Sequence, residues 1–123
     1  MGPNATPAQF VEAIQVAGRL VAGVVATTPD DVRAIIWRHP VETRPPADFA
    51  PRAGLELVLH GHDVAAGLGV AYEPPADVCA RLRDHTRDWR HWNGGAWPPL
   101  TITDDPWGDI VTASGRFRFE PRA

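Results

Sequence analysis

Residues 56–63 read Glu56-Leu57-Val58-Leu59-His60-Gly61-His62-Asp63, so a carboxylate and an imidazole stand four residues apart in a largely apolar run. On a helix, this spacing puts the side chains of Glu56 and His60 on one face, about one turn apart. A carboxylate oxygen and an imidazole nitrogen are ligands that zinc and related divalent metals accept. We therefore predict a helix that carries two metal ligands, Glu56 and His60. In a strand, His60 and His62 would share a face instead.

The neighbours of this pair allow more than one role. Asp63 follows His60 by three residues on the same helical face, so it is placed either to orient the histidine or to serve as a solvated or capping residue. His62 points away from the pair on a helix. A binuclear metal-hydrolase signature would need Asp-His after residue 63, but Val64 and Ala65 follow. A third protein ligand would have to come from elsewhere, and His39 is the candidate by elimination.

The composition favours an ordinary soluble domain. The chain has 123 residues, 44% hydrophobic and 22% charged, which fits one domain, residues 1–123, with a modest core. All 12 basic residues are arginine, and with 13 prolines this suggests a GC-rich, bacterial genome. A net charge of −3 without a basic block argues against nucleic acid as a partner.

The expected location is the cytoplasm. The N-terminus shows no basic segment followed by an apolar core, so no signal peptide is expected. The apolar stretches are interrupted by Gly and charge, so no membrane span is expected. The single cysteine, Cys79, cannot form an intramolecular disulfide, and its expected helical surroundings predict a buried, inert thiol rather than a reactive one.

Capping signals and apolar periods predict a mainly α fold. A first helix should begin at Thr6-Pro7 with a capping box to Gln9 and end near Thr27. A second should run from Pro51 to Leu68, a third from Pro75 to about Trp92, and a short fourth should start at Asp105-Pro106. Between the first two, residues 31–51 contain several prolines and predict a long crossover with one short extended piece. The histidines and tryptophans near the end of the third helix fit a packed face better than a ligand-binding wall.

Part of this sequence resembles a known family. The run Leu57–Ala65, followed by Gly69 and the Pro74-Pro75 turn, looks like a signature of actinobacterial DinB-like metal-binding proteins, which include the mycothiol-dependent maleylpyruvate isomerase family. Weaker similarity continues at Trp97-Pro98-Pro99 and from Asp105-Pro106-Trp107 to Ser114-Gly115-Arg116. The resemblance covers most of the chain but only about the later half of the family domain.

The resemblance implies a partial DinB-like helical bundle in which Glu56 and His60 match the family's carboxylate and histidine metal ligands. It implies a divalent metal, zinc above all, and a low-molecular-weight thiol such as mycothiol as cofactors. The expected function is thiol-dependent isomerase or transferase-like chemistry on a small electrophile. Two alternatives stay open: a non-catalytic shortened homologue that binds a ligand or partner, and a remnant without activity.

Three long helices and a short one should leave apolar surface uncovered. Proteins seldom leave a large apolar patch in water. We therefore consider a homodimer that completes the bundle through the Phe10–Val25 helix or the Glu56–Asp63 helix, with His39 or His85 of the second copy brought toward the metal ligands.

Overall fold

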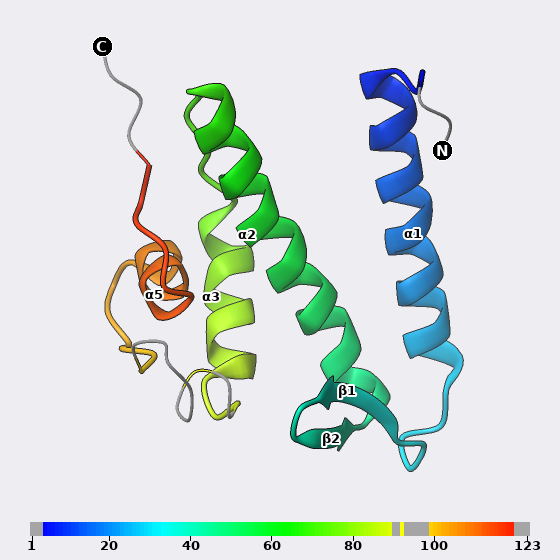
Figure 1. Cartoon of the computed structure of the whole chain (residues 1–123). Coiled ribbons are helices and arrows are strands. Elements are labelled where there is room, and N and C mark those ends of the chain that lie inside the picture. Colours follow the sequence, from blue (N-terminus) through cyan, green and yellow to red (C-terminus); the bar gives the residue numbers. More distant parts are fainter. Residues whose placement is uncertain (1–3, 90–91, 93–98, 120–123) are drawn as a thin grey trace. The chain divides into compact units, whose positions relative to one another are not determined.

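The computed structural model describes residues 4–89, 92 and 99–119 (Figure 1). The described chain is mainly helical with one two-stranded sheet, as expected for a mainly α fold. It separates into two compact units, residues 1–53 and 54–123, and each is described by itself. Helix α2 (Phe49–Leu68) begins in the first unit and continues into the second. The expectation of a single domain stays a prediction.

Helix α1 (Pro7–Thr27) has the predicted start and end. The Gln9 backbone N–H donates to the Thr6 hydroxyl (3.4 Å) and the Gln9 side chain accepts from the Thr6 N–H (2.8 Å), which forms the capping box. At the other end the Thr28 hydroxyl donates to the Val24 carbonyl (2.6 Å), and Pro29 follows. None of the residues of α1 is buried.

The length and composition of α1 bear on the expectation that no segment spans a membrane. The helix has 21 residues, a mean hydropathy of 1.5 over its most apolar window and no buried residue in that window, so it is long and apolar enough to cross a membrane. The core helix of a soluble protein or a signal sequence passes the same test, so this finding is weak evidence for a span. Glu12, Gly18, Arg19 and Gly23 do interrupt the apolar residues of α1, and the expectation of no membrane span stays a prediction.

Residues 31–51 are more regular than the predicted crossover. Strands β1 (Ala34–Arg38) and β2 (Val41–Arg44) form an antiparallel hairpin whose connection contains the His39–Pro40 bond, in the cis form. A short 3-10 turn, η1 (Pro46–Asp48), leads into α2, which begins at Phe49 rather than Pro51. The β-branched and aromatic residues of this stretch favour strands, and their pairing partner lies only a few residues away.

Within the second unit, α2 presents one face to the interior. Its buried residues are Leu55, Val58, Leu59, His62 and Ala65. A left-handed residue, Gly69 (φ 71°), follows the end of the helix at Leu68, as predicted. Since residues 53–66 are helical, the strand interpretation in which His60 and His62 share a face is excluded.

Helix α3 (Ala76–Thr86) runs back beside α2 and is shorter than predicted (Figure 1). The expected end near Trp92 is wrong, because the chain turns after Thr86. There the Trp92 indole N–H donates to the Thr86 hydroxyl (3.1 Å), which itself donates to the Leu82 carbonyl (2.7 Å). On a continuous helix Thr86 and Trp92 would be about 9 Å apart along the axis and on different faces. Leaving the helix therefore lets Trp92 become fully buried beside Thr86.

Helix α5 (Pro106–Ala113) closes the second unit against α3 (Figure 1). The Asp105 carboxylate caps it by accepting from the Gly108 N–H (3.0 Å), and Gly115 (φ 73°) lies just beyond its end, both as predicted. The apolar core of this unit gathers side chains from α2, α3, α5 and the segment after α3: Leu55, Val58, Leu59, Cys79, Leu82, Trp89, Trp92, Trp107, Ile110 and Val111.

One buried ion pair fixes α5 to α3. The Arg83 guanidinium donates to Asp109 (2.8 Å), and the two side chains are only 10% and 5% exposed. Asp109 also accepts from the backbone N–H (2.9 Å) and the hydroxyl (2.7 Å) of Thr103. Every oxygen of this carboxylate therefore has a protein donor, which offsets the cost of removing it from water.

We expect Asp109→Ala to lower the free energy of unfolding by about 3–5 kcal/mol, because it leaves the Arg83 guanidinium buried without its carboxylate. Urea denaturation followed by circular dichroism measures this change. Asp77→Ala is the matched control: it breaks the exposed Arg81–Asp77 pair (3.1 Å) on α3 and should cost less than about 1 kcal/mol. Equal losses in the two variants would contradict the role assigned to the buried pair.

Candidate functional site

The predicted metal ligands lie together on the exposed side of α2. The His60 Nε2 atom is 3.1 Å from Glu56 Oε2, and the His60 Nδ1 atom is 3.3 Å from Asp63 Oδ2. The helical period accounts for this arrangement, since the three residues follow one another at intervals of four and three. The side chains are 47% (Glu56), 65% (His60) and 42% (Asp63) exposed, so a solute can reach them.

A fourth residue holds this row from outside the helix. Arg116, in the segment after α5, makes two parallel contacts with Asp63: Nε to Oδ1 and Nη2 to Oδ2, both 2.7 Å. Hydrogen bonding from Arg116 holds the pKa of the Asp63 carboxyl well below its ordinary range, and burial opposes this only in part. The same contact raises the pKa of the Arg116 guanidinium, and attraction to Glu56 adds to it.

His62 belongs to the core rather than to this row. It is 6% exposed, and its ring lies edge-on to the Trp107 indole with the centroids 5.8 Å apart. Its Nε2 atom accepts from the Phe119 backbone N–H (3.3 Å), so the neutral ring carries its proton on Nδ1. That Nδ1 atom is 3.5 Å from Asp63 Oδ1, yet it forms no hydrogen bond with any described residue. His62 therefore helps to hold the C-terminal segment against α2.

The described residues do not supply a third metal ligand. No group of three or more His, Cys, Asp or Glu side chains among them is arranged to hold a metal ion. His85 lies edge-on to Trp89 with the ring centroids 6.2 Å apart, and His39 lies in the connection between β1 and β2, in the other unit. Asp63 is close to His60 but already binds Arg116. Glu56 and His60 therefore have no third partner of this kind among the described residues.

Cys79 does not provide a nucleophile. Its side chain is fully buried, as predicted, and burial raises the pKa of its thiol above the ordinary value. Repulsion from the carboxylates of Asp105 and Asp77 acts in the same direction. A buried thiol with a raised pKa carries little thiolate at neutral pH. Any thiol chemistry would have to use a small-molecule thiol.

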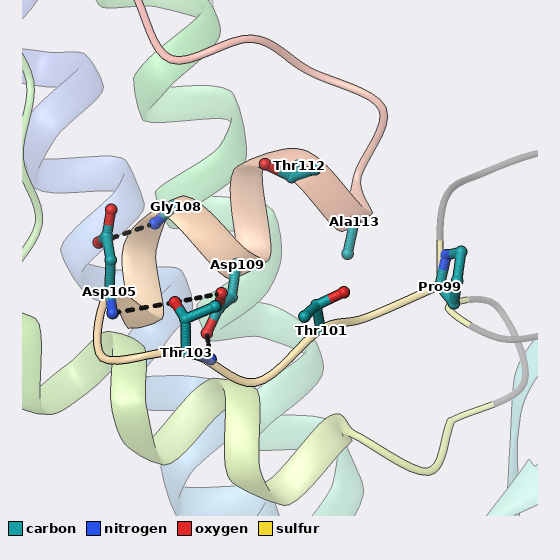
Figure 2. Close-up of a pocket in the computed structure, with 8 residues that line it drawn as sticks. All are labelled: Pro99, Thr101, Thr103, Asp105, Gly108, Asp109, Thr112 and Ala113. Atoms are coloured by element: carbon teal, nitrogen blue, oxygen red, sulfur yellow. Dashed lines mark hydrogen bonds between the residues drawn. The ribbon is translucent and has the colours of Figure 1, made fainter.

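A cavity of about 330 Å³ lies between residues 99–103 and α5 (Figure 2). Its wall includes Thr101, Thr103 and Thr112 and the carboxylates of Asp105 and Asp109. Both carboxylates already have partners: Asp105 accepts from the Gly108 N–H (3.0 Å) and from Arg118 (2.9 Å), and Asp109 binds Thr103 and Arg83. The acidic side chains at this cavity therefore serve the fold, and no sequence pattern indicated the cavity in advance.

The arrangement offers one oxygen and one nitrogen ligand at the surface, with a carboxylate behind the imidazole. Arg116 was missed because no local pattern links it to Asp63, 53 residues earlier. Comparison of the chain with protein-family models, with curated proteins and with solved structures found no match. The case for a function therefore depends on these residues, their geometry and the sequence resemblance.

We expect Arg116→Gln to destabilise the fold by up to about 1 kcal/mol at neutral pH, since the lost pair is partly exposed. The lowered pKa of Asp63 means that the folded state holds this carboxylate charged where the unfolded chain, with a pKa near 3.9, begins to take up a proton. The stabilisation is therefore present above about pH 4 and is lost as the pH falls. Thermal denaturation of wild type and variant at pH 7, 5, 4, 3 and 2 should show their midpoints converging toward low pH.

The control for this titration is Arg81→Gln, which removes the exposed partner of Asp77 and should shift the midpoint little at any pH. A difference between wild type and Arg116→Gln that stays constant from pH 7 to pH 2 would rule out the charged pair as its cause.

Proposed function

We propose that this protein is a small DinB-like metal-binding protein and that Glu56 and His60 are ligands to a divalent metal, zinc in the first place. The observation that carries the proposal is the approach of His60 Nε2 to Glu56 Oε2 (3.1 Å) on an accessible face of α2. Two side chains one helical turn apart, with their ligand atoms already converging, need little rearrangement to share an ion.

The position of Asp63 supports the same role for His60. Metal-binding histidines commonly donate their second ring N–H to a carboxylate, which fixes the tautomer and makes the ligand nitrogen more basic. Asp63 Oδ2 lies 3.3 Å from His60 Nδ1, on the side of the ring away from Glu56. With an ion bound at Nε2, the neutral ring would carry its proton on Nδ1, where Asp63 can accept it.

The described residues supply two of the ligands that such a site needs. Catalytic zinc sites use three protein ligands and keep a further position for water or substrate, and Glu56 and His60 are two of them. A divalent ion here would lower the pKa of a coordinated thiol and so favour its thiolate. With the resemblance to mycothiol-dependent enzymes, this leads us to propose thiol-dependent isomerase or transferase-like chemistry on a small electrophile in the cytoplasm. In this proposal Glu56 and His60 bind the ion, and Asp63 orients the His60 ring.

Zinc binding measured by isothermal titration calorimetry tests this proposal. Glu56→Ala and His60→Ala each remove one of two protein ligands and should abolish measurable binding. Asp63→Ala should weaken binding roughly 10- to 100-fold, the usual cost of losing a residue that orients a ligand. His85→Ala is the control, because it removes a histidine of the same unit that packs on Trp89. Equal, tight zinc affinity in wild type and Glu56→Ala would refute the assignment.

A second candidate function, a non-catalytic binding module, is favoured by the exposed apolar surface of α1. Phe10, Ile14, Leu20 and Val24 are 48%, 52%, 65% and 63% exposed, although they lie in the apolar arc of an amphipathic helix. The first unit also has a cavity of about 240 Å³ between the end of α1, β1 and the start of α2, lined mainly by apolar side chains, Phe49 among them. Such surfaces suit a protein partner or a small apolar ligand.

We expect the partner of α1 to be a second copy of this chain. The polar stripe of Glu12, Gln15 and Arg19 opposite the apolar arc fits a helix with one face in water and the other against protein. Sedimentation equilibrium at micromolar concentration should give a dimer. Ile14→Glu should shift it to monomer, and Gln15→Glu, on the polar stripe, should not. A folded wild-type monomer would exclude the dimer.

A further inference from the structure

The cavity between residues 99–103 and α5 has a wall that buried contacts already fix (Figure 2). Asp109 on α5 accepts from the Thr103 N–H (2.9 Å) and hydroxyl (2.7 Å), and the Arg83 guanidinium donates to it at 2.8 Å. These contacts hold the extended segment and the helix at one separation. A solute that enters therefore finds a preformed site and does not have to order the two walls, which lowers the cost of binding.

The charges at this cavity are already balanced. Asp109 pairs with the buried Arg83, and Asp105 pairs with Arg118 (2.9 Å) while it caps α5 at the Gly108 N–H (3.0 Å). An anionic solute would approach two carboxylates, and a cationic solute would have to displace a guanidinium from one of them. Since like charges repel and each ion pair is already made, the cavity favours a solute without net charge.

The cavity also has polar groups that the fold leaves unused. Thr101 and Thr112 are exposed, and neither hydroxyl has a hydrogen-bond partner among the residues that the structure describes. A threonine hydroxyl can donate one hydrogen bond and accept two. The Asp105 carboxylate, 49% exposed, has one described donor on each oxygen and keeps a lone pair on each. These groups can therefore bind a solute that donates and accepts hydrogen bonds at several points.

Between the polar groups the lining is small and aliphatic. Pro99, Ala113 and the threonine methyl groups contribute to it, and the lining residues in the described part of the chain include no aromatic ring on which a flat ligand could stack. The volume, about 330 Å³, is at the lower end of the roughly 300–1,000 Å³ of small-molecule sites. The cavity therefore suits one small ring or short chain in which C–H and O–H groups alternate.

We propose that this cavity binds a small neutral polyhydroxyl compound, a monosaccharide or a polyol of similar size. Its hydroxyls exchange hydrogen bonds with Thr101 and Thr112 and donate to Asp105, and its C–H groups contact Pro99 and Ala113. The inference does not depend on the proposed metal binding, because neither proposed metal ligand of α2 lines the cavity.

Titration of ¹⁵N-labelled protein with D-glucose and with D-mannitol, followed by the backbone amide resonances, tests the proposal. At least one of the two should shift the resonances of Thr101, Gly108 and Thr112 and saturate with a dissociation constant on the order of 1 mM, the affinity that a small ligand of this size commonly reaches. D-Glucuronate and protonated D-glucosamine should bind several-fold more weakly than D-glucose. No saturable shift with either neutral compound would overturn the inference, and so would equal or tighter binding of a charged sugar.

Variants locate the binding. Thr112→Val keeps the shape of the side chain and removes its hydroxyl, so it should weaken binding about tenfold, the usual effect of one lost hydrogen bond. Thr112→Ser keeps the hydroxyl and should bind within about threefold of wild type. Thr43→Val, on β2 in the other unit, is the control and should leave the affinity unchanged.

Circular dichroism confirms that each variant is folded, and Thr101→Val, on the extended segment, serves if Thr112→Val is not. Wild-type affinity in a folded valine variant of the cavity would overturn the inference, because it would place the ligand elsewhere. The same conclusion would follow if Thr43→Val lost as much affinity as Thr112→Val.

Discussion

The buried Arg83–Asp109 pair is the interaction on which the arrangement of the second unit depends. Asp109 lies in α5 and Arg83 in α3, and both bind Thr103 in the segment between these helices. One carboxylate therefore fixes the place of α5, and with it the point at which the chain leaves α5 at Gly115. From there the next residue, Arg116, reaches Asp63 on α2. Arg116 thus contacts the accessible row of Glu56, His60 and Asp63 from outside the helix, and its position depends on the buried Arg83–Asp109 pair of the same unit.

Local signals in the sequence predicted the starts and ends of helices well. The capping box at Thr6, the Asp105 cap and the left-handed glycines Gly69 and Gly115 each act within a few residues, so their effect does not require knowledge of the rest of the fold. The end of α3 was mispredicted because it depends on Trp92 reaching Thr86, a contact that competes with continuation of the helix. The hairpin of β1 and β2 was underestimated for a related reason: prolines exclude helix but do not specify the strand that pairs.

The residues of the candidate site were predicted or missed for the same reason. Glu56, His60 and Asp63 were predicted together because a single helical period sets their distances, and the structure gives 3.1 and 3.3 Å between them. Arg116 and the burial of His62 could not be predicted, since both depend on how the segment after α5 packs on α2. A single sequence gives the residues that one element brings together, but not the residues that packing brings to them.

The exposure of Glu56 and His60 also limits what the pair can do. Both side chains keep about half or more of their contact with water. Their mutual contact therefore contributes little to the free energy of unfolding. A contact that stability does not require can be given up without unfolding the protein. Asp63, which Arg116 holds through two contacts of 2.7 Å, lies on the Nδ1 side of the His60 ring, away from Glu56 on the Nε2 side. The exposed fraction of the side chain falls from 65% at His60 to 42% at Asp63 and 23% at Arg116, so this row is most accessible at its histidine and best covered at the arginine.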